Sequence, residues 1–472
     1  MQKLRTLLIN LPEDIHEVHY NNHILQPYGL GMISSYLKQC GRDVVLHDAC
    51  AHATKRKQLL RYIEEEAPNV LGITTMTHGI QQVADLLADA KKVLPGVTTV
   101  VGGPHPSAEY QSLLADHESI DIAVRGEGEY TMEALIDSLQ RGGDLTEVQG
   151  LAFRKGEELV VTPARPPIAD IDSLPFSDWT SFPMDKYWCG WTIRKNYASI
   201  LFSRGCPFSC TFCAHDTVLG RNQRKRSPEL IIEELKLLYD KFGVRQLRVD
   251  DSALIDRKWI QEICEGMLRM GRPLLWGCNV RSTLIDKELL LLMKKSGLVR
   301  LNFGIESADN RMLKAMKKGQ TIEEAEAGIR LINEVGIVAC YTFIVGLPGE
   351  TEESLRKTVD FSRKLEKCFN TFHIATPYPG TEFYETAKKE GLMVKNWANF
   401  DLYKIAYVPK GLTKEILLHH YKRSLTKNLF KPSFILWNIT LTESWINFKI
   451  RLRFAFHVVT RFLKAKKSMS VD

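Results

Sequence analysis

Three closely spaced cysteines are the strongest chemical signal in the sequence. Cys206, Cys210 and Cys213 lie in SRGCPFSCTFCAH, residues 203–215, with C-x3-C-x2-C spacing, in a loop that contains Gly and Pro and follows a predicted strand. Three thiolates in such a loop can bind one face of a cuboidal 4Fe–4S cluster. The fourth iron then keeps an open position, which suits direct binding of a substrate or cofactor. The spacing therefore predicts a catalytic iron–sulfur centre with these three cysteines as metal ligands.

The spacing of the three cysteines alone also allows a zinc site or a chance grouping of core residues. A structural zinc ion takes four protein ligands, and His215 offers the fourth beside the three thiols. Buried cysteines also behave as small apolar residues, although three in one loop at a strand end is an unusual place for core residues.

Composition and charge limit the class of protein. The chain has 472 residues, 44% hydrophobic and 25% charged, which is typical of a globular protein of several domains. Ten cysteines, mostly at irregular spacings, do not suit a disulfide scaffold and indicate a reducing compartment. The sequence has neither the features of a signal peptide nor an apolar run near the roughly 18 residues that span a bilayer. We therefore expect a cytoplasmic protein.

The first part of the chain is expected to form a doubly wound α/β domain, residues 1–145. Short apolar runs alternate with amphipathic segments; the predicted strands are 7–10, 43–46, 70–74, 98–101 and 122–124, and the predicted helices are 31–40, 55–65, 81–93 and 130–139. Helical crossovers make such a sheet parallel, and ligands bind beyond the carboxyl ends of its strands. Gly102 and Gly103 at one end, and Thr75 at another, allow close approach of a large ligand.

A proline-rich linker, residues 146–195, is predicted to lead into a second α/β domain, residues 196–400. Six βα units follow one another there, with predicted strands at 198–203, 246–250, 274–280, 299–305, 340–345 and 371–375. Six parallel units indicate a partial barrel whose site lies at the strand carboxyl ends. The cysteines outside the tight group lie mostly in apolar segments and are expected in the core; of these, Cys189 in YWCGW is the candidate for a reactive thiol near the barrel mouth.

The carboxyl-terminal extension, residues 401–472, carries the positive charge of the chain. From residue 403 onward it has a net charge of +11, whereas the whole chain has +7. Residues 445–467, WINFKIRLRFAFHVVTRFLKAKK, interleave apolar and basic residues at near-helical spacing. The pattern fits a helix packed on the barrel with a solvated basic face, or a basic amphipathic helix on an anionic membrane surface. Nucleic-acid binding is not expected.

The cysteine loop and several later segments resemble the radical S-adenosylmethionine (SAM) superfamily, which carries C-x3-C-x2-C after the first barrel strand. Phe212 matches the aromatic residue beside the adenine, residues 304–307 (GIES) match the ribose-contacting segment, and residues 344–351 (IVGLPGET) match the adenine-flanking segment. Asp250 stands where the family has Gly-Gly-Glu, and Arg281 is a candidate partner for the SAM carboxylate. The resemblance thus predicts SAM contacts at Phe212, Asp250, Arg281, Gly304, Glu306, Ser307, Ile344 and Gly346.

The first domain is similar to the cobalamin-binding domain of the cobalamin-dependent branch of this superfamily. Residues 27–31 (PYGLG), Asp48, residues 102–105 (GGPH) and residues 125–129 (RGEGE) match segments that recur in the branch. The resemblance predicts cobalamin contacts at Pro27, Gly29, Thr75, Gly102, Gly103 and Glu127. A lower-ligand signature, Asp-x-His-x-x-Gly, is only half present at Asp14-Ile15-His16, so His16 is either a cobalt ligand or an exposed loop histidine. GLGMIS, residues 29–34, is a poor dinucleotide fingerprint because serine replaces its third glycine.

The resemblance implies an enzyme that uses a 4Fe–4S cluster, SAM and cobalamin. Reductive cleavage of SAM would give a 5′-deoxyadenosyl radical, and methylation of an unactivated carbon is the favoured outcome. Oxidative cyclisation of the magnesium-protoporphyrin monomethyl ester type is the alternative, and a tRNA-modifying methylthiotransferase or a non-catalytic iron–sulfur sensor is the alternative from another class. The expected partners are a small-molecule substrate such as a lipid, isoprenoid or porphyrin, a low-potential electron donor such as flavodoxin or ferredoxin, and the inner membrane face, contacted peripherally through the tail.

Overall fold

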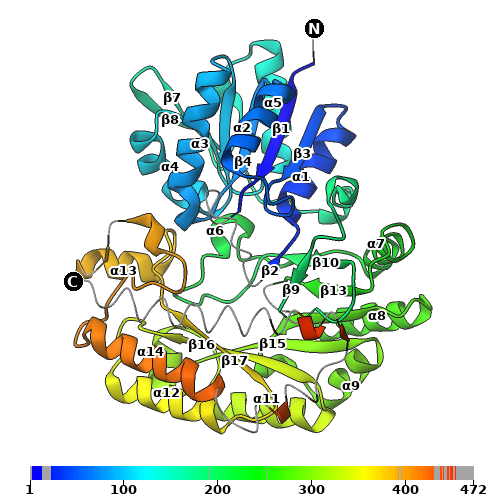
Figure 1. Ribbon diagram of the computed structural model, residues 1–472, viewed down its shortest axis with the longest axis vertical. Helices are drawn as coiled ribbons and strands as arrows, with labels where there is room; N and C mark the ends of the chain where they lie inside the picture. Colours follow the sequence, from blue (N-terminus) through cyan, green and yellow to red (C-terminus); the bar gives the residue numbers. More distant parts are fainter. Residues whose placement is uncertain are drawn as a thin grey trace.

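The computed structural model describes residues 3–12, 23–190, 192–251, 254–391, 393–394 and 396–429, and the single residues or short runs 436–437, 440, 444–445, 447–449 and 452. Two α/β units lie one above the other, with the amino-terminal sheet at the top of Figure 1 and the second sheet below it. His16 and most of the predicted amphipathic segment 445–467 lie outside the described residues. Within the described part, no helix combines the length and the apolar character needed to cross a membrane.

The amino-terminal sheet has seven strands in the order β3-β1-β4-β5-β6-β7-β8. The first five of its strands along the chain run parallel, and β7 and β8 are antiparallel. Its strands are β1 (Arg5–Asn10), β3 (Asp43–Asp48), β4 (Val70–Thr74), β5 (Thr98–Gly102), β6 (Ile122–Val124), β7 (Leu151–Lys155) and β8 (Glu158–Val161). Its helices are α1 (Tyr28–Gln39), α2 (Arg56–Glu66), α3 (Ile80–Val93), α4 (Pro104–Asp116) and α5 (Glu129–Arg141). Continuous apolar runs form the parallel strands because helices cover such a sheet on both faces.

The second sheet has six parallel strands in chain order, β10-β13-β14-β15-β16-β17. They are β10 (Tyr197–Ile200), β13 (Gln246–Val249), β14 (Leu275–Val280), β15 (Leu298–Glu306), β16 (Val338–Val345) and β17 (Phe369–Ile374). The helices between and after them are α7 (Pro228–Lys241), α8 (Arg257–Arg269), α9 (Lys287–Lys295), α10 (Asn310–Ala315), α11 (Ile322–Val335), α12 (Glu352–Lys364) and α13 (Glu382–Glu390). This is the predicted partial barrel of six βα units, open between β10 and β17.

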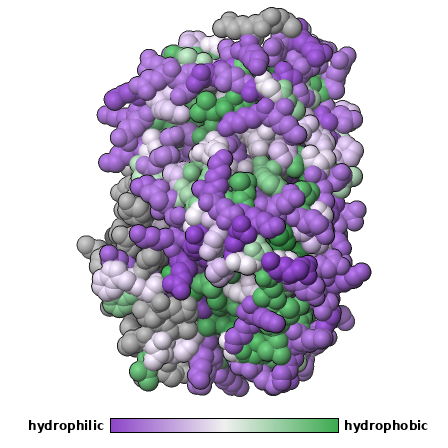
Figure 2. Space-filling view, turned by 90° about the vertical axis from the view of Figure 1, so that its right-hand side faces the viewer, coloured by the Kyte–Doolittle hydropathy of each residue, from purple (hydrophilic) through white to green (hydrophobic). Residues whose placement is uncertain are grey.

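Short elements connect the two sheets and cover the barrel. The strand β2 (His23–Ile24) pairs with β9 (Trp188–Cys189), and β11 (Ser203–Arg204) pairs with β12 (Arg224–Lys225). The one-turn helix α6 (Asp216–Leu219) lies between the two sheets in Figure 1. Part of the basic extension is the helix α14 (Lys414–Leu429), which packs against α12 and β17. Hydrophilic side chains cover most of the face in Figure 2, and the hydrophobic ones gather mainly in its lower half.

Two parts of the predicted organisation differ from the structure. Helix α4 was missed because PHPS, residues 104–107, is typical of a turn, whereas proline in a first helical turn lacks only an amide that has no intrahelical partner. The hairpin β7–β8 falls in the predicted linker, residues 146–195, yet it extends the amino-terminal sheet beyond residue 145. The buried residues of β7, Leu151 to Phe153, were missed because a proline-rich run follows them.

Candidate functional site

The cysteine loop, residues 205–223, starts and ends at the β11–β12 hairpin. Its backbone is fixed at several points: the Cys206 amide donates to the Gly220 carbonyl at 3.2 Å, and the Thr211 amide donates to the Met316 carbonyl at 3.0 Å. Cys206 and Cys210 are half-buried and Cys213 is exposed. Over the described residues, no three His, Cys, Asp or Glu side chains converge on the position of a single metal ion. His215, the other ligand considered for zinc, immediately precedes α6.

Arg281 follows the carboxyl end of β14 and faces the cysteine loop. Its Nη1 lies 3.8 Å from Cys210 Sγ, and its guanidinium lies 3.6 Å from the ring centre of Phe208. The side chain is buried, and its Nε and Nη2 have no hydrogen-bond partner among the described residues. Unpartnered buried donors of a charged group are strongly unfavourable, so this guanidinium is suited to an anion bound beside the loop. The carboxylate of SAM fits that description.

The carboxyl end of β15 supplies the next predicted SAM residues. Glu306 has a φ of +67° and forms a buried ion pair with Lys318 at 2.6 Å. A Cβ on Gly304 would lie 2.3 Å from Glu306 Oε1 and 2.7 Å from Lys318 Nζ, so only glycine leaves room for this pair. Ser307 points away, because its hydroxyl lies 3.2 Å from the Thr358 hydroxyl of α12.

Lys318 is a residue that sequence reasoning missed. It lies in the lysine-rich run 314–318, where no spacing separates a site residue from solvated lysines. Burial raises the pKa of Cys206, and the positive charges of Arg281 and Lys318 act in the opposite direction. The positive charges of Arg281 and Lys318 therefore favour the thiolate form of Cys206.

An apolar wall lies beside the loop at the ends of β16 and β17. Phe212 and Ile344 pack against the same cluster of buried residues, which includes Leu347 and Phe383. Gly346 has a φ of +94°, and its amide donates to Glu350 Oε2 at 3.3 Å. Phe212 and Ile344 therefore border the same apolar cluster, and their contact with the adenine stays a prediction.

Of the neighbouring aspartates after β13, Asp251 is more deeply buried than Asp250, the one predicted to contact SAM. Asp251 accepts a 2.7 Å hydrogen bond from the Phe202 amide and another from the Ser203 hydroxyl, and burial raises its pKa to about 7. Asp250 instead pairs with the guanidinium of Arg248, and its own amide donates to the Ile200 carbonyl at 2.9 Å. Asp251 therefore fixes the segment that leads into the cysteine loop.

The predicted cobalamin residues fall into two groups in the structure. Thr75 and Gly102 lie together at the carboxyl ends of β4 and β5, where the Thr75 amide donates to the Gly102 carbonyl at 3.0 Å. Gly103 next to them has φ +105° and ψ −168°, and a Cβ there would lie 2.8 Å from Thr74 Oγ1 and 2.9 Å from Thr75 O. This is a bare backbone cradle that a side chain would fill.

Pro27 and Gly29 lie at the start of α1. A Cβ on Gly29 would meet nothing within 4 Å, so the space above it is open. Asp48 at the end of β3 is fully buried and accepts hydrogen bonds from Asn10 Nδ2 at 2.8 Å and from the Tyr187 hydroxyl at 2.7 Å. Its described contacts connect strands of the sheet to the linker.

Glu127 has both carboxylate oxygens engaged by protein groups. Arg204 and Arg224 donate to them at 2.9 and 2.7 Å, and the Ile168 amide donates at 2.7 Å. The described contacts of the Glu127 side chain are thus to the barrel hairpin and the linker. Sequence reasoning missed Arg204 and Arg224 because ion pairs between distant segments leave no local pattern.

Cys189 does not lie at the barrel mouth, so that expectation is wrong. It is 2% exposed, lies in β9 opposite His23, and interacts with Tyr197 at the amino end of β10. The cysteine loop follows the opposite, carboxyl end of that strand. Its burial also removes the exposure that a reactive thiol needs.

The family comparisons agree with both halves of this site. The model for the radical SAM superfamily matches residues 200–362, and the model for the B12 binding domain matches residues 21–136. An uncharacterized methyltransferase of Pyrococcus horikoshii is 30% identical over 84% of this chain and 90% of its own. The anaerobic magnesium-protoporphyrin IX monomethyl ester cyclase of Rubrivivax gelatinosus is 33% identical over 76% and 66%, and the hopanoid C-3 methylase of Methylococcus capsulatus is 29% identical over 80% and 72%.

Two solved structures share the whole fold. TsrM of Kitasatospora setae, determined with cobalamin and a [4Fe-4S] cluster bound, has a TM-score of 0.70 at 18% identity and covers 98% of this chain and 100% of its own. OxsB, determined with aqua-cobalamin and S-adenosylmethionine bound, has a TM-score of 0.72 at 18% identity and covers 99% and 76%.

This chain belongs to the radical SAM superfamily, in its cobalamin-dependent branch of methyltransferases and related cyclases. The predicted family, fold class and enzymatic character are confirmed at this level. The two matched family models agree with the predicted cofactor set of 4Fe–4S cluster, SAM and cobalamin. The individual residues predicted to contact the cofactors stay predictions.

Proposed function

We propose that this chain methylates a carbon atom of a small-molecule substrate, using a cluster held by Cys206, Cys210 and Cys213 and a cobalamin held by the amino-terminal domain. The observation that carries the proposal is the buried guanidinium of Arg281, which has two unpartnered nitrogen atoms and lies 3.8 Å from Cys210 Sγ. It combines a charge for the SAM carboxylate with contact to a thiol that would ligate the cluster. Neither a zinc site nor a group of buried core cysteines requires a buried guanidinium with unpartnered nitrogen atoms.

The bound cofactors would supply the electron, the radical and the methyl group, with reduction by a low-potential donor such as flavodoxin or ferredoxin. The chain supplies position and charge. Arg281 would orient the methionine end of SAM, and the Glu306 carboxylate, held by its ion pair with Lys318, would accept hydrogen bonds from the ribose hydroxyl groups. Phe212 and Ile344 provide the apolar surface for the adenine and exclude water from the reacting groups.

The second candidate function is oxidative cyclisation, which the relationship to the magnesium-protoporphyrin cyclases favours. The two reactions separate when the loaded enzyme is incubated with methyl-labelled SAM and dithionite, with a porphyrin ester and a polycyclic isoprenoid as test substrates. Label in the product supports methylation, whereas 5′-deoxyadenosine with unlabelled, ring-closed product supports cyclisation. Failure to cleave SAM at all would overturn both and leave the iron–sulfur sensor.

We further propose a cytoplasmic enzyme that contacts the inner membrane face through its tail. Trp445 and Phe448 are 67% and 40% exposed, their rings stack at 5.4 Å, and Lys449 lies over the Trp445 ring. Ser444 and Asn447 tie this segment to the linker, with hydrogen bonds of 2.8 and 3.1 Å to the carbonyls of residues 193 and 192. Exposed aromatic rings beside basic residues are typical of interfacial segments.

Flotation with anionic phosphatidylglycerol vesicles tests the membrane contact. We expect the double change Trp445→Ala with Phe448→Ala to reduce vesicle binding severalfold, because the two rings would bury apolar surface in the interface in addition to the salt-sensitive attraction of the basic residues. Leu291→Ala is the matched control, since Leu291 is an apolar side chain of the barrel helix α9 that is 49% exposed. Equal binding by the double variant and the control would contradict the contact.

A further inference from the structure

The hairpin that encloses the cysteine loop is joined to the amino-terminal domain by a buried cluster of charges. Arg204 in β11 and Arg224 in β12 are paired residues of this hairpin, so they stand side by side at the base of the loop. Glu127 and Glu129 come from the other domain, where they lie at the start of helix α5. We call these four side chains the interdomain charge cluster.

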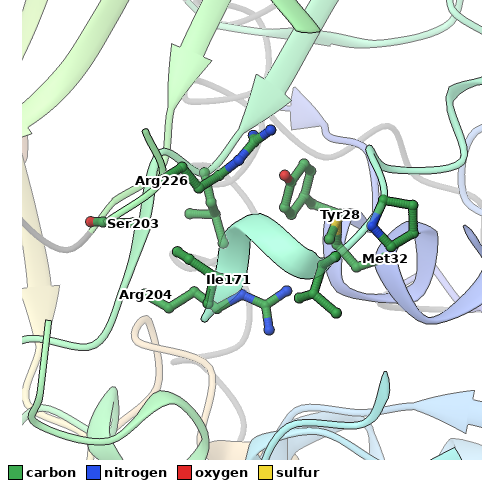
Figure 3. A pocket seen from close by; sticks show the side chains of 9 residues that line it. Tyr28, Met32, Ile171, Ser203, Arg204 and Arg226 are labelled. Carbon is green, nitrogen blue, oxygen red and sulfur yellow. The ribbon is translucent and has the colours of Figure 1, made fainter. Parts of the chain in front are cut away.

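The contacts within the interdomain charge cluster are short and numerous. Arg204 donates to Glu127 Oε1 at 2.9 Å and to Glu129 Oε1 at 2.5 Å, and Arg224 donates to Glu127 Oε2 at 2.7 Å. All four side chains are at most 8% exposed. Arg224 also donates to the Ile168 carbonyl at 2.7 Å, which fixes the linker to the same point. Figure 3 shows Arg204 extending from the strand that carries Ser203 toward the side of α1.

The interdomain charge cluster is better suited to fixing the relative orientation of the two domains than to adding net stability. Buried ion pairs add little net stability because the cost of desolvation offsets their attraction. Separating the two partners is nevertheless strongly unfavourable, because it leaves a buried charge without a partner. A guanidinium held by two carboxylates also has a fixed orientation that a packed apolar contact lacks. The amino end of α5 adds a favourable helix dipole for both glutamates. Such a cluster permits one relative placement of its two domains.

The connection from Arg204 to the first cysteine is short and stiff. Only Gly205 separates Arg204 from Cys206, and it has a φ of +87°. A Cβ on Gly205 would lie 2.2 Å from the Asn222 carbonyl oxygen, so the two sides of the loop are in direct backbone contact. A displacement of Arg204 therefore moves Cys206 with it.

We propose that the interdomain charge cluster is a positioning device that sets the distance between the cluster-binding loop and the cobalamin-binding domain. The inference rests on the proposed function, because it requires that both sites hold their cofactors. Arg204, Arg224 and Glu129 act as positioning residues: they hold the two sites at one separation and take no part in ligating either cofactor.

The distance between the two cofactors tests this directly in the loaded enzyme. Cob(II)alamin and a reduced 4Fe–4S cluster each carry an unpaired electron, so pulsed electron paramagnetic resonance measures their separation. We expect one narrow distance distribution in the native chain, and a broadened or shifted one in Arg204→Gln and Glu129→Gln with unchanged iron and cobalamin content. Arg204→Lys keeps the charge but loses the two-pronged contact, so it should restore the native distribution only partly.

A matched control comes from the amino-terminal domain itself. Arg42 contacts Glu133 at 2.6 Å and Asp137 at 2.8 Å, which is also one arginine between two carboxylates, but all three lie in one domain. Arg42→Gln should leave the distance distribution unchanged. Native distributions in both Arg204→Gln and Glu129→Gln, at full cofactor content, would overturn the proposal. If Arg204→Gln does not fold, Glu129→Gln provides the same comparison, because Arg204 and Arg224 keep their contacts with Glu127 in that variant.

Hydrogen exchange on the chain without cofactors separates this proposal from the proposed function. We expect amides of residues 127–129, 168 and 203–206 to exchange faster in Glu129→Gln, by on the order of tenfold, because the cluster protects both domains at once. In one outcome, the native chain binds neither cofactor while Glu129→Gln still exchanges faster at these residues of both domains. That result would overturn the proposed function and support the charge cluster as the connection between the domains. Unchanged exchange in the variant would overturn the charge cluster.

Discussion

Replacing Gly103 by alanine is the sharpest test of the cobalamin site. Gly103 has φ +105° and ψ −168°, a region of backbone space open essentially to glycine alone. An added Cβ would lie 2.8 Å from Thr74 Oγ1 and 2.9 Å from Thr75 O. The threonine hydroxyl can rotate away, but the Thr75 carbonyl belongs to the backbone at the end of β4. The substitution must therefore move the backbone at one or both strand ends.

The size of the effect follows from the strain. Holding a residue with a side chain in this conformation costs about 1–3 kcal/mol. The free variant relieves the strain by relaxing the cradle, and cobalamin binding must restore the cradle, so the strain is subtracted from the binding free energy. A loss of about 1–3 kcal/mol corresponds to a fall in affinity of roughly 5-fold to 150-fold. Titration with hydroxocobalamin, followed by equilibrium dialysis and absorbance, measures it.

Gly142→Ala separates this effect from general backbone strain. Gly142 has a φ of +66° at the end of α5, in the same domain, but a Cβ there meets nothing within 4 Å. We expect a modest loss of stability and native cobalamin affinity. Native affinity in a folded Gly103→Ala chain would refute the assignment of the β4 and β5 ends as the cobalamin cradle.

Three further predictions concern the barrel site. Cys210→Ala should lower the iron content and abolish reductive SAM cleavage, measured as 5′-deoxyadenosine; retention of both would remove the cluster from the site. Arg281→Lys should keep the iron content but weaken SAM binding by on the order of tenfold, measured by dialysis of labelled SAM, because a lysine cannot form the two-pronged contact with a carboxylate; unchanged binding would refute its role. Asp251 has a folded pKa of about 7 against an ordinary value of 3.8, so its contribution to stability is present at low pH and is lost as the pH rises through 7. Asp251→Asn should therefore gain stability relative to the native chain by about 1.4 kcal/mol per pH unit between pH 5 and 7, measured by urea unfolding, and a difference independent of pH would contradict the raised pKa.

The parts of the fold and of the candidate site that could be predicted from the sequence depend on short-range pattern. The cysteine loop can be predicted from the spacing of its cysteines and the strand before it. The glycines at the ends of β5 and β16 can be predicted from the strands that they follow. In the same way, apolar runs located all five parallel strands of the first sheet, because parallel strands are buried on both faces.

What sequence missed depends on residues far apart in the chain. Arg204 meets Glu127 across 77 positions, and neither residue has a local reason to be buried. Trp397 follows the barrel, yet its ring lies 5.1 Å from His105 at the start of α4, so it packs on the other domain. Asp251 differs from Asp250 only in direction, since successive residues after a strand point to opposite sides.

The placement of the loops indicates where a substrate would react under the proposed function. The turn at Gly380, beyond the end of β17, approaches both Thr217 of α6 and Ala108 of α4, with a Cβ on Gly380 lying 2.5 and 3.2 Å from their side chains. Helix α4 itself begins at the carboxyl end of β5. The carboxyl ends of both parallel sheets therefore open toward one shared boundary, where α6 lies in Figure 1. Parallel sheets bind ligands at these ends. Under the proposed function, a methyl group held by one domain and a radical generated in the other would therefore meet at that boundary. A substrate that reacts with both must bind there, and a change in the separation of the two domains would alter the transfer step even when each cofactor is bound normally.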